Sequence, residues 1–376
     1  MPRAALLLLA VGAACGSSPA AKPGDDTGTP DAVAWSPPDV AGPFVPGTEV
    51  SSLTLGDGRA AEVQVWYPAA ADAPGALHRY DGTFSRAALD APPAACDGPR
   101  PVVVFSHGNG GVRWQSAFFT EHLASRGWVA IAPDHAGNTI FDDSAALSEL
   151  VLRRPRDVAA TFDHLLTLAG PGGILDGCVD ATAGYAVVGH SFGGYTAFAV
   201  AGAGIDLPAS EAHCASVGGW LCNALFTAAE SEAPGATTLS LGDPRAWASV
   251  PLTPAGWEVL VGGLADIAVP TLVMGGGRDT LTPMDDMVRP MAQGLRAPSR
   301  ALATLPDAGH YTFSDVCALA PTFEDCAPPY LDAATAHPLI AAVATAWLER
   351  ELGSPEAAAF LPPDSPLLVW DPLPVE

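Results

Sequence analysis

The chain has 376 residues, of which 49% are hydrophobic, and a formal net charge of −24. This hydrophobic content is ample for a buried core, which excludes a chain that is disordered throughout. The negative charge excludes nucleic acid as a partner, because nothing in the chain could neutralise a run of phosphates, and anionic membrane surfaces would repel it. Acidity alone selects no substrate.

The N-terminus has the pattern of a targeting segment, with a signal peptide at residues 1–14. Arg3 supplies a positive start, and residues 4–14 form an apolar run that is too short to span a bilayer as a helix. Cys15 follows in a sequence that resembles the lipobox of bacterial lipoproteins, although Gly12 stands where that family usually has Leu. We expect an exported protein, either lipidated at Cys15 and held in the bacterial cell envelope, or cleaved after the Ala pair and secreted.

The segment after the signal peptide, residues 15–45, is rich in Gly, Ser, Pro, Asp and Thr, which predicts a flexible tether. Two alternating runs follow, at residues 50–55 and 61–67. Gly56, Asp57 and Gly58 join them and predict a β-hairpin of antiparallel edge strands.

The body of the chain alternates short β-branched runs with helical stretches, which predicts an α/β fold with a mostly parallel central sheet and helices on both faces. We expect further strands at 101–106, 128–133, 185–189, 247–252, 271–274 and 301–305, and helices at 114–126, 156–168, 193–203, 284–293 and 337–352. The domain is expected to span 46–353, with a cap-like insertion at 204–245. Of the proline-rich tail at 354–376, residues 367–370 either pack on the body or stay loose.

An even number of cysteines, six, remains when Cys15 is set aside, which in an exported protein indicates disulfides. The pairs expected from spacing are Cys214 with Cys222, Cys317 with Cys326 and, by elimination, Cys96 with Cys178. Free buried thiols are the alternative for some of them. Metal binding is disfavoured, because no pair has CxxC spacing and no histidine cluster accompanies them, and no metal or organic cofactor is expected.

A serine nucleophile is indicated by Gly189-His190-Ser191-Phe192-Gly193, which follows a predicted strand and precedes an Ala-rich helix. In that setting GxSxG forms a sharp turn whose flanking positions must be glycine, because a Cβ there would collide with neighbouring backbone. The turn leaves the hydroxyl of Ser191 exposed at the carboxyl edge of the strand.

Such a serine needs a histidine to take its proton and an acid to orient that histidine, and in this fold the acid precedes the histidine in the chain. His310, in the loop after the strand at 301–305, is the expected base. The other histidines beyond the serine are His213, in a cysteine loop, and His337, which we expect to begin the last helix.

The expected acid is Asp279, which ends a glycine loop after the strand at 271–274. That strand should lie two positions beyond the strand of the nucleophile, within reach of the histidine loop. If Asp279 only caps the following turn, the acid is instead Asp243, Asp266 or Asp307.

Two backbone amides are needed to stabilise the oxyanion. We expect one from Phe192, at the start of the helix after the nucleophile, and the other from Asn109, in the glycine-rich loop after the strand at 101–106. His107, in the same loop, is interpreted as structural. The aromatic residues Trp114, Trp220 and Phe192 either line an apolar cleft or pack in the core.

These motifs resemble the α/β-hydrolases grouped with platelet-activating-factor acetylhydrolase, predicted dienelactone hydrolases and bacterial polyester hydrolases. The shared stretches, within residues 100–312, are VVVFSHGNGG, HLASRGWVAIAPDHAGNT, RRPRDV, GHSFGGYTA, and TLVMGGGRDTLTP with the later GH. The resemblance implies the α/β-hydrolase fold, ester hydrolysis, and a site in which Ser191 is the nucleophile, Asp279 the acid, His310 the base, and Asn109 and Phe192 the oxyanion donors. Dienelactone hydrolases proper use cysteine where this chain has Ser191. The acetylhydrolases can take their acid from an earlier strand, so a carboxylate other than Asp279 stays an alternative for the acid.

The sequence therefore predicts an exported serine hydrolase that cleaves a carboxylic ester, of a small molecule or a lipid, by way of an acyl-enzyme. A lipase or a polyester hydrolase is the alternative among enzymes. A non-catalytic surface lipoprotein of the same fold is the alternative from another class, and the intact order of Ser, Asp and His argues against it.

Overall fold

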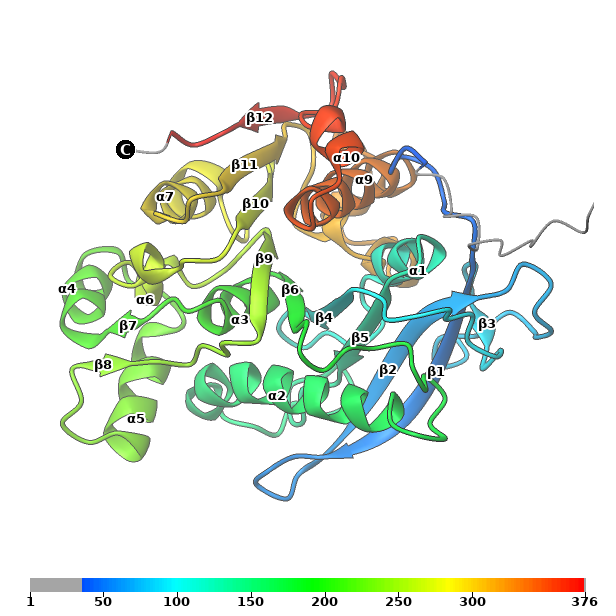
Figure 1. Ribbon diagram of the computed structural model, residues 1–376. Coiled ribbons are helices and arrows are strands. Elements are labelled where there is room, and N and C mark those ends of the chain that lie inside the picture. The colour runs from blue at the N-terminus through cyan, green and yellow to red at the C-terminus, as the bar shows by residue number, and fades with distance from the viewer. Residues whose placement is uncertain (1–35, 375–376) are drawn as a thin grey trace, which may run out of the picture. The chain divides into compact units, whose positions relative to one another are not determined.

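A computed structural model describes residues 36–374 of the chain. The predicted signal peptide, Cys15 and most of the predicted tether lie outside these residues. The described part is built on a ten-stranded sheet with the order β12-β11-β10-β9-β6-β4-β5-β2-β1-β3 (Figure 1).

The sheet is mostly parallel, with antiparallel strands toward both ends. Its strands are β1 (Val45–Thr54), β2 (Ala60–Ala69), β3 (Leu89–Asp90), β4 (Val102–Ser106), β5 (Val129–Pro133), β6 (Tyr185–His190), β9 (Ala246–Leu252), β10 (Thr271–Gly276), β11 (Arg300–Leu305) and β12 (Val369–Asp371). Strands β5, β4, β6, β9, β10 and β11 pair in parallel, whereas β1 and β2 form the predicted antiparallel hairpin and β12 runs antiparallel to β11. This is the α/β-hydrolase fold expected from the sequence.

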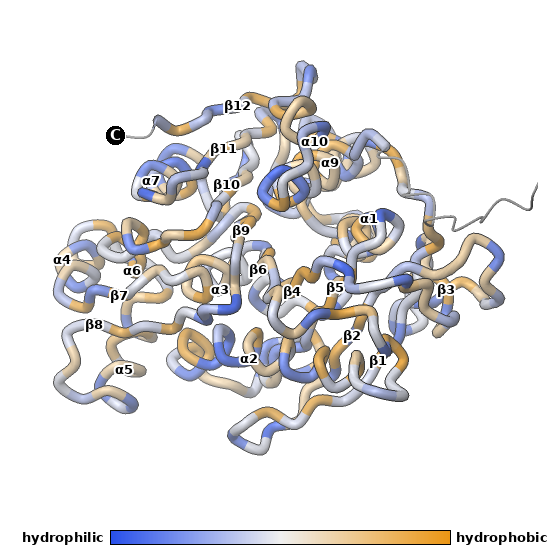
Figure 2. The backbone as a smooth tube through the Cα atoms, viewed as in Figure 1, coloured by the Kyte–Doolittle hydropathy of each residue, from blue (hydrophilic) through white to orange (hydrophobic). Residues whose placement is uncertain are grey.

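Helices cover both faces of the sheet (Figure 1). One face carries α1 (Ala117–Ser125) and α9 (Ala333–Glu351), and the other carries α2 (Leu147–Leu168), α3 (Phe192–Val200) and α7 (Arg289–Gly294). Alternate residues of one strand enter different cores: Val102 and Val104 pack on the α2 side, whereas Val103 and Phe105 pack on the α1 side. Figure 2 shows hydrophobic and hydrophilic residues alternating along α2, as expected for a helix with one buried face.

The remaining elements are short. They are α4 (Leu207–Val217), α5 (Cys222–Glu232), α6 (Trp257–Leu260), α8 (Val316–Leu319), α10 (Pro355–Phe360), the two-stranded ribbon of β7 (Ile205–Asp206) and β8 (Thr238–Leu239), the π-helix η2 (Met284–Val288), and the 3-10 turns η1 (Leu264–Asp266), η3 (Tyr311–Phe313) and η4 (Glu324–Cys326). The insertion at 204–245 therefore consists of two helices and a ribbon.

Two helices begin earlier than predicted. Helix α2 begins at Leu147 and continues through Pro155, because burial of apolar side chains such as Leu150 and Val151 offsets the hydrogen bond that proline removes. Helix α9 begins at Ala333, since the carboxylate of Asp332 caps it, so the prediction that His337 begins this helix is wrong.

Both ends of the described chain are more firmly packed than their composition indicates. The amide groups of Gly42 and Phe44 donate to Ser125 at the end of α1, so residues 36–44 of the predicted tether lie against the body. The proline-rich tail supplies β12, in which Trp370 pairs with Ala303 of β11. The tail is thus an edge of the sheet.

Three disulfides join the six cysteines of the described region: Cys96 with Cys178, Cys214 with Cys222, and Cys317 with Cys326. Disulfides of this number are typical of proteins that fold outside the reducing cytoplasm, which indicates an exported protein. Within residues 36–374, no helix combines the length and the apolar character needed to cross a membrane.

Candidate active site

The turn between β6 and α3 holds Ser191 in a strained conformation, with φ 58° and ψ −116°. Such a conformation costs a non-glycine residue about 1–3 kcal/mol and is found mainly at functional sites. The neighbouring glycines are required by the close approach of backbone. A Cβ at Gly189 would lie 2.1 Å from the carbonyl oxygen of Gly193, and a Cβ at Gly193 would lie 1.9 Å from that of Ser106.

Asp279 and His310 meet at the carboxyl ends of two adjacent strands, β10 and β11. Nδ1 of His310 donates a hydrogen bond of 2.8 Å to Oδ2 of Asp279. The other carboxylate oxygen, Oδ1, accepts from the amides of Leu281 and Thr282, each at 2.8 Å, and the hydroxyl of Thr282 donates to Oδ2 at 2.7 Å. The carboxylate is therefore fully satisfied and rigidly placed.

The charge of Asp279 follows from these contacts. Burial acts to raise its pKa, but the hydrogen bond and the charge of His310, with those from Thr282, outweigh burial and hold the pKa below its usual value. An ionised Asp279 keeps the proton of His310 on Nδ1, which leaves Nε2 free to accept a proton.

Ser191 and His310 line the same cleft, which has a volume of about 330 Å³. Its wall also includes Gly108, Asn109, Trp220, Leu281, Met287 and Tyr311. No hydrogen bond joins Ser191 to His310 in the part of the chain that the structure describes. In substrate-free enzymes this contact is often long and tightens only when substrate binds.

His190, next to the serine, connects the two sides of the cleft. Its Nε2 donates to the carbonyl oxygen of His310 at 3.0 Å, and its Nδ1 accepts from Gln115 at 2.8 Å. Gln115 in turn accepts from the amide of Gly108 at 3.0 Å. Burial, together with the nearby His310, lowers the pKa of His190 to about 3, so the ring is neutral and acts as a fixed link. The sequence pattern assigns no role to His190, and its position inside the GxSxG motif is the only local signal for it.

The two expected oxyanion donors belong to segments next to the serine. Phe192 is the first residue of α3, and Asn109 follows β4 in the wall of the cleft. Neither amide donates to another group among residues 36–374. His107 is fully buried, its Nδ1 bonded to the carbonyl oxygen of Gly108 and its Nε2 to the amide of His135. It is absent from the wall of the cleft, which fits the structural interpretation.

The alternative acids lie elsewhere. Asp307 is exposed and pairs with Arg278, whereas Asp243 is bonded to Arg245 at the opposite end of β9. Asp266 lies exposed in η1. None of the three lines the cleft.

The alternative histidines are also outside the cleft. His213 lies in α4 against the ring of Trp257, and His337 stacks on Phe118 with its Nε2 bonded to the carbonyl oxygen of Ser314. Of the aromatic candidates, Trp114 is buried, whereas Trp220 lines the cleft and contacts the ring of Phe192 edge-on.

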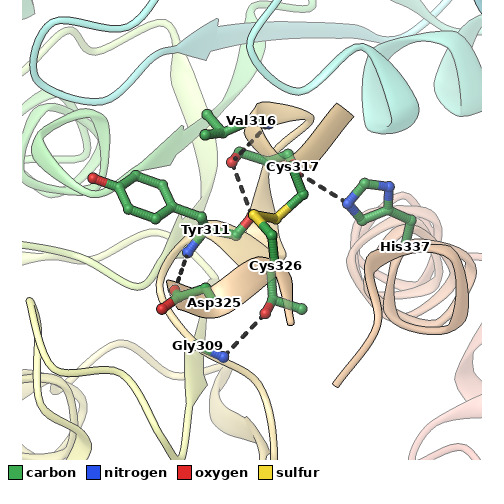
Figure 3. The surroundings of a disulfide bond; sticks show 9 residues. Gly309, Tyr311, Val316, Cys317, Asp325, Cys326 and His337 are labelled. Atoms are coloured by element: carbon green, nitrogen blue, oxygen red, sulfur yellow. Dashed lines mark hydrogen bonds between the residues drawn. A yellow bond between two sulfur atoms is a disulfide. The ribbon is translucent and has the colours of Figure 1, made fainter. Parts of the chain in front are cut away.

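The loop that carries His310 is braced by the disulfide between Cys317 and Cys326 (Figure 3). Asp325, next to Cys326, accepts a hydrogen bond of 2.7 Å from the amide of Tyr311. A Cβ at Gly309 would lie 2.4 Å from the carboxylate of Asp325, so only glycine fits beneath it. The disulfide therefore helps to fix both neighbours of His310.

A larger cavity, of about 610 Å³, lies between α1 and α9 and is lined by Arg86, Asp315 and His337 among others. It contains neither Ser191 nor His310, and its arginine, Arg86, is already paired with Asp315 at 2.8 Å. Chemistry rather than size therefore selects the smaller cleft. Across residues 36–374, no three His, Cys, Asp or Glu side chains are grouped so that they could hold a metal ion.

Comparison with known proteins agrees with the fold. Residues 83–159 match the family described as platelet-activating factor acetylhydrolase, isoform II. The matched segment contains β3, β4, α1, β5 and the first half of α2, and so includes Asn109 but not Ser191, Asp279 or His310. No curated protein matches the chain. The family match confirms the resemblance and indicates a hydrolase acting on small-molecule or lipid esters.

Proposed function

We propose that the protein is an exported serine esterase that cleaves carboxylic esters through an acyl-enzyme on Ser191. The observation that carries the proposal is the 2.8 Å hydrogen bond between His310 and the buried Asp279, in a cleft whose wall also holds Ser191 on its strained turn. Nucleophile, acid and base then follow one another in the chain order typical of the fold, after the carboxyl ends of β6, β10 and β11.

The reaction follows from these positions. Nε2 of His310 takes the proton of Ser191 as Oγ attacks the ester carbonyl carbon, and the charge on the carbonyl oxygen is stabilised by the amides of Asn109 and Phe192. The intermediate collapses, and the alcohol leaves with the proton from His310. Water then attacks the acyl-enzyme with His310 as base, which releases the carboxylic acid and restores Ser191.

Shape and lining favour a small ester. A volume of about 330 Å³ is near the lower end for ligand sites, and Trp220, Leu281 and Met287 make the wall apolar. We therefore expect short, uncharged acyl groups to be preferred over long chains. A lipase or polyester hydrolase remains the alternative, and activity toward long-chain or polymeric esters would favour it.

Export is supported by the disulfides and by the signal-like residues 1–14, and we propose Cys15 as the lipidation site. Wild-type protein expressed with its own leader should incorporate a labelled fatty acid and fractionate with membranes, whereas Cys15→Ser should not. Unlabelled wild-type protein in the medium would instead support free secretion.

The test of function is hydrolysis of p-nitrophenyl esters from acetate to palmitate by residues 36–376. Ser191→Ala should abolish activity and labelling by a fluorophosphonate probe, whereas Ser144→Ala, at an exposed serine, should change neither. If the folded wild-type protein cleaves no ester and the probe leaves Ser191 unlabelled, the non-catalytic surface lipoprotein takes the place of the esterase.

A further inference from the structure

A buried arginine, Arg154, lies directly behind the proposed oxyanion hole. It projects from α2, has no exposed surface, and no carboxylate of the described residues lies within ion-pair distance of it. Asp157, whose charge acts on Arg154, is instead paired with Arg59 at 3.0 Å and His135 at 3.0 Å. A buried charge without a direct counter-ion costs several kcal/mol. Its presence at this place requires an explanation other than stability.

All the hydrogen bonds of Arg154 go to neutral oxygen atoms, three of them in residues 106–108, just before Asn109. The acceptors are the carbonyl oxygens of His107 and Gly108 (3.4 Å for Gly108), the hydroxyls of Ser106 (3.2 Å) and Thr196 (3.3 Å), and Oδ1 of Asn138 (2.5 Å). Burial lowers the pKa of Arg154 to about 9, partly opposed by the charge of Asp157, so the guanidinium stays charged at neutral pH.

The direction in which the Asn109 amide points follows from these contacts and from the geometry of the peptide bond. In a trans peptide the C=O and the following N–H point in opposite directions. The carbonyl of His107 faces Arg154, and the amide of Gly108 accordingly faces the other way, to Gln115. In the next peptide the carbonyl of Gly108 faces His107 and Arg154, which directs the amide of Asn109 away from them, toward the cleft.

Two further contacts tie Arg154 to both donors. Asn138, which accepts from Arg154, donates to Oδ1 of Asn109 at 2.9 Å. The guanidinium carbon lies 4.6 Å from the centre of the ring of Phe192, the residue of the second donor. The same cation therefore contacts the two segments that supply the oxyanion donors.

We infer that Arg154 is a positioning residue of the oxyanion hole, which aims the Asn109 amide at the substrate and places a buried positive charge behind the developing oxyanion. The inference rests on the proposed esterase function. A positive charge in a site shielded from water stabilises an oxyanion more strongly than it could in solution. Burying Arg154 thus lowers the stability of the folded protein, whereas its charge lowers the activation free energy of the reaction.

The test compares Arg154→Met and Arg154→Lys with Arg156→Gln, which removes an exposed arginine from the same helix. For a short p-nitrophenyl ester, Arg154→Met should lower kcat by about 10²–10³-fold while KM changes by less than about threefold. Arg154→Lys should be intermediate, because it keeps the charge with fewer donors, and Arg156→Gln should match wild type.

A second readout separates this role from a general structural one. A trifluoromethyl ketone forms a negatively charged adduct with the serine, so its affinity should fall in parallel with kcat. The acid limb of the pH profile should stay in place, because His310 and Asp279 are untouched. If Arg154→Met does not fold, Asn138→Ala decides: it keeps the cation, cuts the link to Asn109, and should lower kcat by about tenfold.

Wild type and Ser191→Ala measured alongside show whether the esterase function itself holds. If wild type is inactive, the proposed function and this inference fall together. If wild type is active and the folded Arg154→Met retains kcat and ketone affinity within about threefold, the inference alone is overturned. An unfolded Arg154→Met combined with unchanged kcat in Asn138→Ala would overturn it too.

Discussion

Replacing Asp279 by asparagine tests the site without changing its shape. Oδ1 of Asp279 accepts two backbone N–H bonds, from Leu281 and Thr282, so only the oxygen of an asparagine side chain can occupy that position. The NH₂ group must then take the place of Oδ2, facing Nδ1 of His310. Because an amide N–H donates, Nδ1 becomes the acceptor and the imidazole proton moves to Nε2. His310 in that tautomer has no lone pair to offer Ser191.

The expected loss is large, because the base is removed while the fold is kept. In a serine protease the corresponding change lowers kcat about 10⁴-fold, equivalent to about 5.4 kcal/mol in the activation free energy. We expect Asp279→Asn to lower kcat by about 10³–10⁴-fold at pH 7 with little change in KM, measured with a short p-nitrophenyl ester.

The matched control is the same substitution at Asp307, an exposed aspartate on the adjacent loop that pairs with Arg278. Asp307→Asn should retain activity close to that of wild type. Near-normal activity in a folded Asp279→Asn, or an equal loss in Asp307→Asn, would refute Asp279 as the acid and return the choice to the other carboxylates.

Three further changes bear on stability. Gly193→Ala would place a Cβ 1.9 Å from a backbone oxygen of β4 and should prevent folding or lower the free energy of unfolding by several kcal/mol. The control Gly56→Ala has open space around its Cβ and should leave stability unchanged. Equal urea midpoints for the two variants would contradict this prediction. Replacing Cys96 and Cys178 by serine opens a loop of 82 residues and should lower the free energy of unfolding by about 4–5 kcal/mol. This loss should exceed that from removing either of the other two disulfides, which close loops of 8 and 9 residues. An equal or smaller loss would contradict the explanation by chain entropy. Burial lowers the pKa of His122 to about 4, so the unfolded chain binds more protons than the folded one between pH 6.5 and 4, and stability should fall as the pH falls through that window. His122→Gln should reduce this fall by up to about 3 kcal/mol in urea titrations at pH 7.5 and 4.5, and an unchanged pH dependence would show that His122 is not its source.

Local patterns were enough for much of the fold. The run of β-branched residues at β4, the hairpin signal before β2, and the strand-GxSxG-helix sequence around Ser191 each depend on a few neighbouring residues, so the sequence predicts them directly. Chain order in this fold then indicated Asp279 and His310, which the structure brings within 2.8 Å of each other.

Contacts between distant segments decided what local patterns could not. The sequence leaves open whether the proline-rich tail packs on the body or stays loose, and residues 369–371 complete the sheet because β11 offers a free edge to pair with. Helix α2 reads as starting after Pro155, yet it begins at Leu147 because the sheet buries its first turns.

The same holds for the inner layer of the site. His190 and the backbone of His310 are 120 residues apart in sequence, and Arg154 is 47 residues from the carbonyl it holds at His107. The sequence motif around each residue does not identify its hydrogen-bond partners, because these come from distant segments. The sequence by itself determined the class of fold and predicted Ser191 as the nucleophile with its partners in order, because these inferences depend on local turns and strands. Only the tertiary structure decided which side chains hold that machinery in place, because hydrogen bonds and burial between distant segments exist only once the sheet has formed.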